Sequence, residues 1–209
     1  MENINLYEIM KVISNAMIEA EPQLTAFDSE LGDGDCGMGM KTGFTAVLAA
    51  LEGSENAAPA DILKKTAMNL ISSVGGTSGA IYGTAFMKMA AAAKNAASYD
   101  LVAVADILEA GLNGAKMRGE DTKVGDKTLI DALEPAVYAF KEKAAAGASL
   151  QECCAAATVA AKEGSDSTIN LIAKKGRASY LGERSIGHRD AGSYGIYVIA
   201  DAVEKAVTK

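Results

Sequence analysis

The feature that most constrains this chain of 209 residues is the helical spacing of its apolar side chains. Apolar residues three and four positions apart line one face of a helix, whereas a half-buried strand alternates with period two. Few runs in the sequence alternate, and there are only three prolines. The sequence therefore predicts an all-α fold with about eight helices in a single domain, 1–209. Their apolar stripes cover residues 6–17, 40–51, 62–74, 82–93, 101–112, 130–140, 150–157 and 196–207.

Several residues predict how individual helices begin, bend or pack. Pro59 suits the first turn of a helix, and Ser149 with Glu152 forms a capping-box pattern. Pro135 interrupts an apolar stripe, so we expect the helix to kink or restart there. Cys153 and Cys154 lie on a stripe and are expected in the core.

Charge and cysteine content narrow the class of protein. The net charge of −7 disfavours binding to nucleic acid or to an anionic membrane through the overall field. Three cysteines do not make a disulfide framework, and we see neither a secretory signal nor an apolar run long enough to span a bilayer. A cytoplasmic location is the expectation.

Four segments break the helical pattern: Phe27–Gly39, Val74–Gly79, Met117–Leu129 and Gly176–Gly195. Each is rich in Gly, Asp, Ser or Thr, and each joins two predicted helices. Because loops carry chemistry more often than the scaffold does, we expect a site assembled from them at the ends of the helices.

The first segment carries three carboxylates, Asp28, Asp33 and Asp35, among glycines. Two carboxylates about 4 Å apart repel by about 4 kcal/mol at an effective dielectric constant of 20, so their clustering favours a cation between them. Mg²⁺ prefers such oxygen ligands and often completes its shell with substrate phosphates, which implies a nucleotide. The alternative is a solvated acidic surface loop.

The second and fourth segments could hold phosphate. Thr77 or Ser78 could cap the helix that follows, and free amides at a helix start attract anions; a plain helix cap is the alternative. Arg177 and two further arginines of the last segment could bind phosphate oxygens. The alternative is a solvated basic loop with a structural His188.

Taken together, these segments resemble the DhaL family, the nucleotide-binding subunits of dihydroxyacetone kinases. The resemblance rests on Phe27–Ser29 with Gly32–Asp35, then GGTSG, GDKTLIDAL and GRASYLGERSIGHRDAGS, in this order over nearly the whole chain. It implies a barrel of eight antiparallel helices with ADP or ATP at one end. It also implies two Mg²⁺ ions held by Asp28, Asp33 and Asp35.

The same resemblance implies the residues around the nucleotide, and it assigns no catalytic side chain. The phosphates would contact Cys36, Gly37, Met38, Gly39, Thr77 and Ser78. The adenine and ribose would contact Gly119, Thr128 and Leu129, while Arg177, Asp190, Ala191 and Gly192 would close over the nucleotide.

The implied activity is phosphoryl transfer to dihydroxyacetone or a similar short keto-sugar held on a separate DhaK subunit. A DhaM subunit recharges the nucleotide in phosphoenolpyruvate-dependent systems, and ATP-dependent relatives exchange ADP for ATP. Cys36 stands where the usual bacterial loop has His, as in ATP-dependent kinases. Ala191 replaces a frequent Pro, and the stretch Glu120–Val124 is about one residue longer than usual.

Two alternative functions and the oligomeric state stay open at this point. The chain could instead be a non-catalytic, nucleotide-bound partner that signals to a transcription regulator. A related kinase class that phosphorylates fatty acids has a similar metal loop, but its second glycine loop and its lid differ. The chain could also form a homo-oligomer.

Overall fold

The computed structural model describes residues 5–208, and these residues form nine α-helices and two 3₁₀ helices without a strand. This confirms the predicted all-α class. The α-helices are α1 Leu6–Glu19, α2 Glu21–Leu31, α3 Cys36–Leu51, α4 Pro59–Ser73, α5 Gly76–Asn95, α6 Leu101–Arg118, α7 Ile130–Ala145, α8 Leu150–Ser167 and α9 Ala191–Val207. The 3₁₀ helices are η1 Thr168–Asn170 and η2 Arg177–Ser185.

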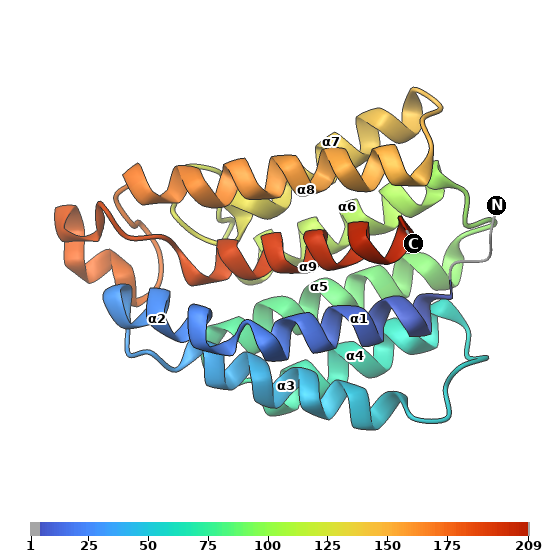
Figure 1. Ribbon diagram of the computed structural model, residues 1–209, viewed down its shortest axis with the longest axis horizontal. Helices are drawn as coiled ribbons and strands as arrows, with labels where there is room; N and C mark the ends of the chain where they lie inside the picture. Colours follow the sequence, from blue (N-terminus) through green and yellow to red (C-terminus); the bar gives the residue numbers. More distant parts are fainter. Residues whose placement is uncertain (1–4, 209) are drawn as a thin grey trace.

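Eight of the helices close into a barrel, which Figure 1 shows from the side. From α3 to α9 each helix packs against the next in chain order, and α1 closes the ring by packing against both α9 and α3. Helix α2 continues from α1 beyond Ala20 and packs against α3 and α9 at one end. The number of helices in the ring agrees with the number of apolar stripes in the sequence.

The antiparallel order places every second connection at the same end of the barrel. The links α2–α3, α4–α5, α6–α7 and α8–α9 gather at the left in Figure 1, while α1 begins and α9 ends at the right. These four links are the segments that broke the helical pattern. Four helices, α3, α5, α7 and α9, therefore start at one end, and the positive ends of their dipoles point there.

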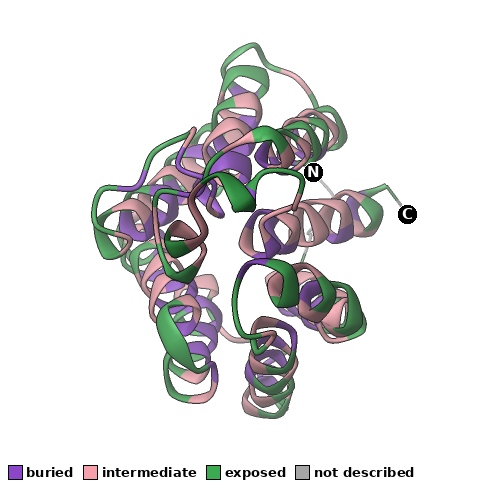
Figure 2. Ribbon diagram, turned by 90° about the vertical axis from the view of Figure 1, so that its left-hand side faces the viewer, coloured by how far each residue is buried: buried purple, intermediate pink, exposed green. Residues whose placement is uncertain are grey.

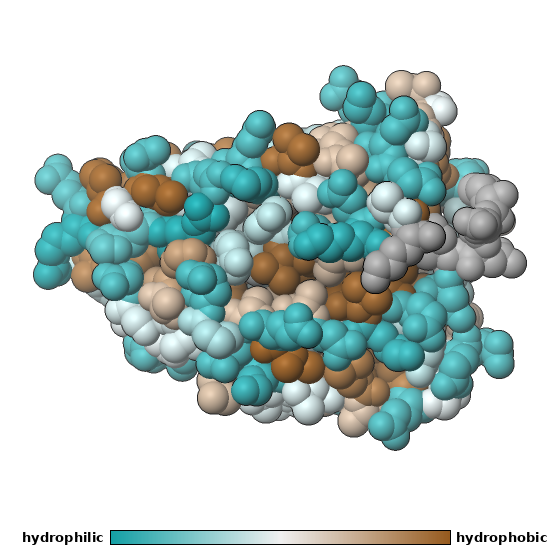
Figure 3. Space-filling model, viewed as in Figure 1, coloured by the Kyte–Doolittle hydropathy of each residue, from teal (hydrophilic) through white to brown (hydrophobic). Residues whose placement is uncertain are grey.

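The barrel is filled by aliphatic and methionine side chains with few aromatic ones. Buried residues line the inner faces of the helices (Figure 2), among them Met17, Phe44 and Leu70, each with no exposed area. A second, smaller cluster includes Cys153 and Cys154, which confirms their predicted place in the core. The outer face shown in Figure 3 is mostly hydrophilic, with smaller apolar patches. No helix within residues 5–208 is both long and apolar enough to cross a membrane.

The structure corrects the predicted extent of the irregular segments. Phe27 and Asp28 lie in helix α2, which the sequence did not reveal, because α2 buries only Leu24 and Leu31 and so shows no continuous stripe. The first link shrinks to 32–35 and the second to 74–75. Residues 177–185 form η2.

The structure confirms two predicted helix starts and corrects the prediction for Pro135. Pro59 begins α4, and Ser149 and Glu152 form the capping box of α8. Helix α7 does not restart at Pro135; it runs unbroken through it. The proline lies in the second turn of α7. The one backbone hydrogen bond that it cannot donate is therefore near the start of the helix, next to the first amides, which have no partner within the helix in any case.

Candidate functional site

The three predicted carboxylates come together at the end of the barrel where the four links gather. One oxygen from each of Asp28, Asp33 and Asp35 lies within 4.8 Å of the others. Asp28 sits in the last turn of α2, whereas Asp33 and Asp35 come from the short link to α3. Gly34 adopts a φ of +73°, which is favourable for glycine and turns the chain between the two exposed aspartates. We call these residues the acidic trio.

Tight packing of α3 on α2 determines where the trio lies. The Cys36 amide donates a hydrogen bond to Asp28 Oδ2 at 3.1 Å, tying the start of α3 to the end of α2. A Cβ atom on Gly37 would lie 2.3 Å from the Glu21 carbonyl oxygen and 2.7 Å from the Thr25 amide nitrogen. Only glycine allows the two backbones to approach this closely.

The chemistry of the acidic trio fits a hard divalent cation. All three side chains offer carboxylate oxygens; Asp28 is half-buried and the other two are exposed. This exposure leaves room for water or phosphate oxygens in a metal's coordination shell, as Mg²⁺ requires. Among the described residues, Arg177 is the cation that pairs with the trio, through Asp33.

Two helix starts adjoin beside the trio. Neither α3, with Asp35 as its N-cap, nor α5, with Gly75, has a side-chain hydrogen bond at its cap. A Cβ atom on Gly39 would lie 3.9 Å from the Gly75 amide nitrogen, so the first turns of these helices are neighbours. The Cys36 amide already donates to Asp28, so the amides that suit a phosphate group are those that follow it in the first turn of α3 and those of the first turn of α5.

The predicted capping role of Thr77 or Ser78 is wrong. Gly75 is the N-cap of α5, so Thr77 and Ser78 lie inside its first turn. A glycine N-cap has no side chain to accept a hydrogen bond, and the amides of that turn are left for another acceptor. Ser78 is half-buried and Thr77 exposed.

The starts of α7 and α9 form a neighbouring part of the same end. A Cβ atom on Gly192 would lie 3.2 Å from Leu129 Cβ, so the two predicted nucleotide-contacting segments touch. The Tyr82 hydroxyl of α5 donates to the Gly192 carbonyl oxygen at 3.2 Å. Thr128 lies beside Leu129, and its amide donates to Asp131 Oδ2 at 2.7 Å. Ala191 is buried as the first residue of α9.

Gly119 is less closely tied to these groups. It is the C-cap of α6, and its carbonyl oxygen accepts a hydrogen bond from the Thr122 hydroxyl. Glu120 and Asp121 follow with φ values of 57° and 54°, in the left-handed region. This stretch is the one that is about one residue longer than is usual in the DhaL family.

Burial and neighbouring carboxylates disfavour negative charge on two side chains at this end. Burial raises the pKa of the Cys36 thiol to about 12, with further contributions from the charges of Asp28, Asp190 and Asp35. Burial likewise raises the pKa of Asp190 to about 7, and the charge of Asp131 adds to the shift. A bound cation would favour the charged forms of these carboxylates.

The basic residues of the last segment do not act as one group. Arg177 alone among them reaches the trio. His188 pairs through Nδ1 with Glu30 Oε2 at 3.4 Å. Arg189 Nη2 lies 2.7 Å from Asp166 Oδ1, so this guanidinium is held within the scaffold.

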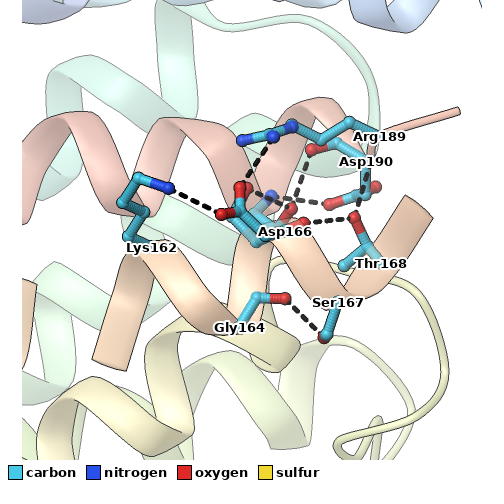
Figure 4. A network of polar contacts seen from close by, with 9 residues as sticks. Lys162, Gly164, Asp166, Ser167, Thr168, Arg189 and Asp190 are labelled. Atoms are coloured by element: carbon cyan, nitrogen blue, oxygen red, sulfur yellow. Dashed lines mark hydrogen bonds and ion pairs between the residues drawn. The ribbon is translucent and has the colours of Figure 1, made fainter. Parts of the chain in front are cut away.

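Figure 4 shows the polar network around Asp166. Asp166 also pairs with Lys162 at 2.7 Å, and the Asp190 amide donates to Thr168 Oγ1 at 3.1 Å. Arg189 additionally lies over the ring of Phe27, at 5.5 Å from its centroid. The contacts of Arg189 with Asp166 and of Asp190 with Thr168 join the end of α8 to the start of α9, and the contact of Arg189 with Phe27 adds α2.

Sequence reasoning missed three buried charged residues at this end, Asp126, Lys127 and Asp131. They are 4%, 2% and 1% exposed. Asp131 accepts hydrogen bonds from the Thr128 and Gly125 amides and so shapes the link before α7. The only signal in the sequence is their place in the polar run GDKTLID, which by itself does not distinguish a buried charge from a solvated one.

Comparisons with known proteins agree with this architecture. The model of the DAK2 domain matches residues 30–205. The chain is 40% identical over 170 residues to the ADP-binding subunit DhaL of the phosphoenolpyruvate-dependent dihydroxyacetone kinase of Escherichia coli K12, covering 81% of this chain and 80% of that protein. It is 37% identical over 197 residues to a second DhaL subunit, from Listeria innocua, covering 93% and 90%.

A solved structure shows the same fold. It is the dihydroxyacetone kinase of C. freundii in complex with AMP-PNP and Mg²⁺, with a TM-score of 0.77 and 22% identity. The match covers 98% of this chain but 34% of that one, so the chain spans about a third of that kinase. On the family match and on the identity to the two subunits, the chain belongs to the DAK2 domain family.

Proposed function

We propose that this chain is the nucleotide-binding phosphotransferase subunit of a kinase for dihydroxyacetone or a similar short keto-sugar. The observation that carries the proposal is the acidic trio, with its oxygens within 4.8 Å of one another, beside the two uncapped helix starts of α3 and α5. The similar proteins of E. coli and L. innocua are named ADP-binding subunits, which supports a nucleotide as the ligand.

In this proposal the trio would hold Mg²⁺, two ions by analogy with the family. When bound, the metal neutralises phosphate oxygens and helps to align the transferred phosphoryl group. The phosphates would contact the backbone of Cys36, Gly37, Met38 and Gly39 together with Thr77 and Ser78. The adenosine would lie near Gly119, Thr128 and Leu129, under Arg177, Asp190, Ala191 and Gly192.

Arg177 would change partner when a nucleotide binds. Its guanidinium pairs with Asp33 in this structure, and a metal on Asp33 would compete for the same carboxylate. The side chain is 66% exposed, so it is free to swing toward a phosphate. One guanidinium group can donate two parallel hydrogen bonds to the oxygens of a phosphate, which suits closure over a nucleotide.

The acceptor sugar would come from a partner. By the resemblance to the DhaL family, we assign sugar binding to a separate DhaK-like subunit and recharging of the nucleotide to a DhaM-like subunit. A cytoplasmic location, the single domain 1–209 and a homo-oligomer stay predictions.

Calorimetry with ADP, with and without Mg²⁺, tests the nucleotide site. Replacing two carboxylates of the trio, Asp33→Asn with Asp35→Asn, is expected to weaken Mg²⁺-dependent ADP binding about a hundredfold or more, since each charged contact contributes roughly 1.5–3 kcal/mol. The control carries Glu55→Gln with Asp61→Asn, two exposed acids outside the four links. Equal affinity in both double variants would contradict the proposal.

A second experiment tests the transfer itself. The purified chain is mixed with a DhaK-like subunit and dihydroxyacetone, and either ATP or a phosphoenolpyruvate-driven DhaM-like subunit supplies phosphate. Sugar phosphate formed in one case identifies the donor. Tight ADP binding without transfer to any such subunit would favour the non-catalytic, nucleotide-bound partner.

A further inference from the structure

The segment between α8 and α9, residues 168–190, is a loop whose two ends meet. We call it the strap. The Gly187 amide donates to the Ile169 carbonyl oxygen at 2.8 Å, and the Asp190 amide donates to Thr168 Oγ1 at 3.1 Å. These contacts make a narrow neck, from which the rest of the strap projects as a compact surface loop.

A lysine from another part of the chain closes this neck. Lys127 Nζ donates to the carbonyl oxygens of Thr168 and His188, one on each side of the neck, at 2.5 Å. The lysine is 2% exposed and its φ is 61°. A buried ammonium group needs acceptors and opposite charge; Asp131 and, once it is ionised, Asp190 provide that charge.

The far part of the strap reaches the acidic trio. Arg177, the first residue of η2, pairs with Asp33. The Ala173 amide donates to Ser185 Oγ at 2.9 Å, which joins the two limbs of the strap between its neck and its tip. The two limbs therefore form a continuous path from the neck to η2, the element that carries Arg177.

We infer that Lys127 is a positioning residue that fastens the neck of the strap and so holds Arg177 over the acidic trio. The fastening of the neck stands on the contacts alone. Its consequence, slower release of a bound nucleotide, rests on the proposed function.

The test compares Lys127→Met, which keeps the unbranched side chain but removes the charged amino group, with the wild type. Hydrogen exchange at the Gly187 and Asp190 amides of the ligand-free protein is expected to rise about tenfold or more, since hydrogen bonds to a charged group are lost. Release of a fluorescent ADP in the presence of Mg²⁺ is expected to accelerate by a similar factor.

The matched control is Lys174→Met. Lys174 also links the strap to the α6–α7 link, since its Nζ donates to the Gly125 carbonyl oxygen at 2.7 Å, but its side chain is exposed. An exposed contact of this kind contributes little, so exchange and release are expected to change less than about twofold. Equal effects of the two variants would overturn the inference.

A double-mutant cycle separates positioning from general support of the fold. If Lys127 acts through Arg177, the double variant Lys127→Met with Arg177→Ala releases ADP at the same rate as Arg177→Ala alone. If Lys127 only supports the fold, its replacement accelerates release in the Arg177→Ala background as well. Should Lys127→Met fail to fold, Thr168→Val removes another neck contact and serves in the same cycle.

The wild type gives a further check without any variant. If the amides of Gly187 and Asp190 exchange as fast as the amide of Tyr180, a residue that is 88% exposed, the inference is overturned. A wild type that binds no ADP would instead contradict the proposed function, while hydrogen exchange would still report on the neck.

Discussion

At the scale of the residue, the candidate site holds a carboxylate in surroundings that disfavour its charge. This carboxylate is Asp190. Burial raises its pKa from 3.8 to about 7; the charges of Asp131 and Asp28 add to the shift, while the Ser193 amide and Lys127 oppose it. Such shifts are typical of sites where charge is needed for binding rather than for stability.

We expect this shift to make the metal-free protein less stable as the pH rises. Between about pH 4 and pH 7 the folded state holds a proton on Asp190 that the unfolded state has lost, so the free energy of unfolding falls through this window and levels off above it. Asp190→Asn keeps an acceptor for the Ser193 amide but does not titrate.

Thermal unfolding from pH 4 to pH 8, without Mg²⁺ or nucleotide, measures the effect. The variant is expected to gain on the order of 1–3 kcal/mol relative to the wild type across the window. Parallel stability curves for the two proteins would show that Asp190 does not titrate in this range.

At the scale of the element, the contact of α2 with α3 decides whether the acidic trio exists. The helices approach at Gly37, where a side chain would meet the backbone of Glu21 and Thr25. Backbone atoms cannot move aside as a flexible side chain can. The link 32–35 is short, so any separation of the helices also separates Asp28 from Asp33 and Asp35.

Gly37→Ala is therefore expected to destabilise the protein by about 1–3 kcal/mol, the usual effect of overpacking. It is also expected to weaken Mg²⁺ binding. Gly39→Ala is the matched control, two residues along the same helix, where the added Cβ atom would meet Val74 at an ordinary 3.6 Å. Chemical unfolding measures both, and equal stability of the two variants would contradict the packing argument.

At the scale of the whole molecule, the alternation of an antiparallel barrel builds the site. Every second link falls at one end, so four helix starts and the acidic trio share it. The positive ends of the helix dipoles attract phosphate, while the carboxylates attract metal. Neither a metal ion alone nor a phosphate group alone complements both the helix starts and the carboxylates, whereas a metal–nucleotide complex does.

Binding of this complex is expected to stabilise the entire barrel. Ligand at about one hundred times its Kd adds about 2.7 kcal/mol, which for a protein of this size raises Tm by roughly 5–10 °C. Thermal unfolding with ADP and Mg²⁺ measures the shift, and EDTA is the control. The combined Asp33→Asn and Asp35→Asn variant should show almost none of it; a full shift in that variant would place the ligand elsewhere.

Helix period and carboxylate spacing are local properties, and the sequence revealed both. The stripes predicted the eight helices of the ring, and Asp28, Asp33 and Asp35 are close in the chain and stay close in space. Helix α2 was not predicted because only Leu24 and Leu31 of it are buried. The N-cap of α5 was predicted wrongly because a glycine N-cap has no side chain that the sequence pattern could indicate.

The sequence by itself determined the helical class and the acidic, glycine-rich links, since neighbouring residues encode them. Only the tertiary structure decided that Leu129 meets Gly192, that Arg177 reaches Asp33 and that Lys127 is buried at the neck of the strap. These contacts join residues far apart in the chain. Closure of the ring and burial bring them together, and no local pattern of residues records which distant groups will meet.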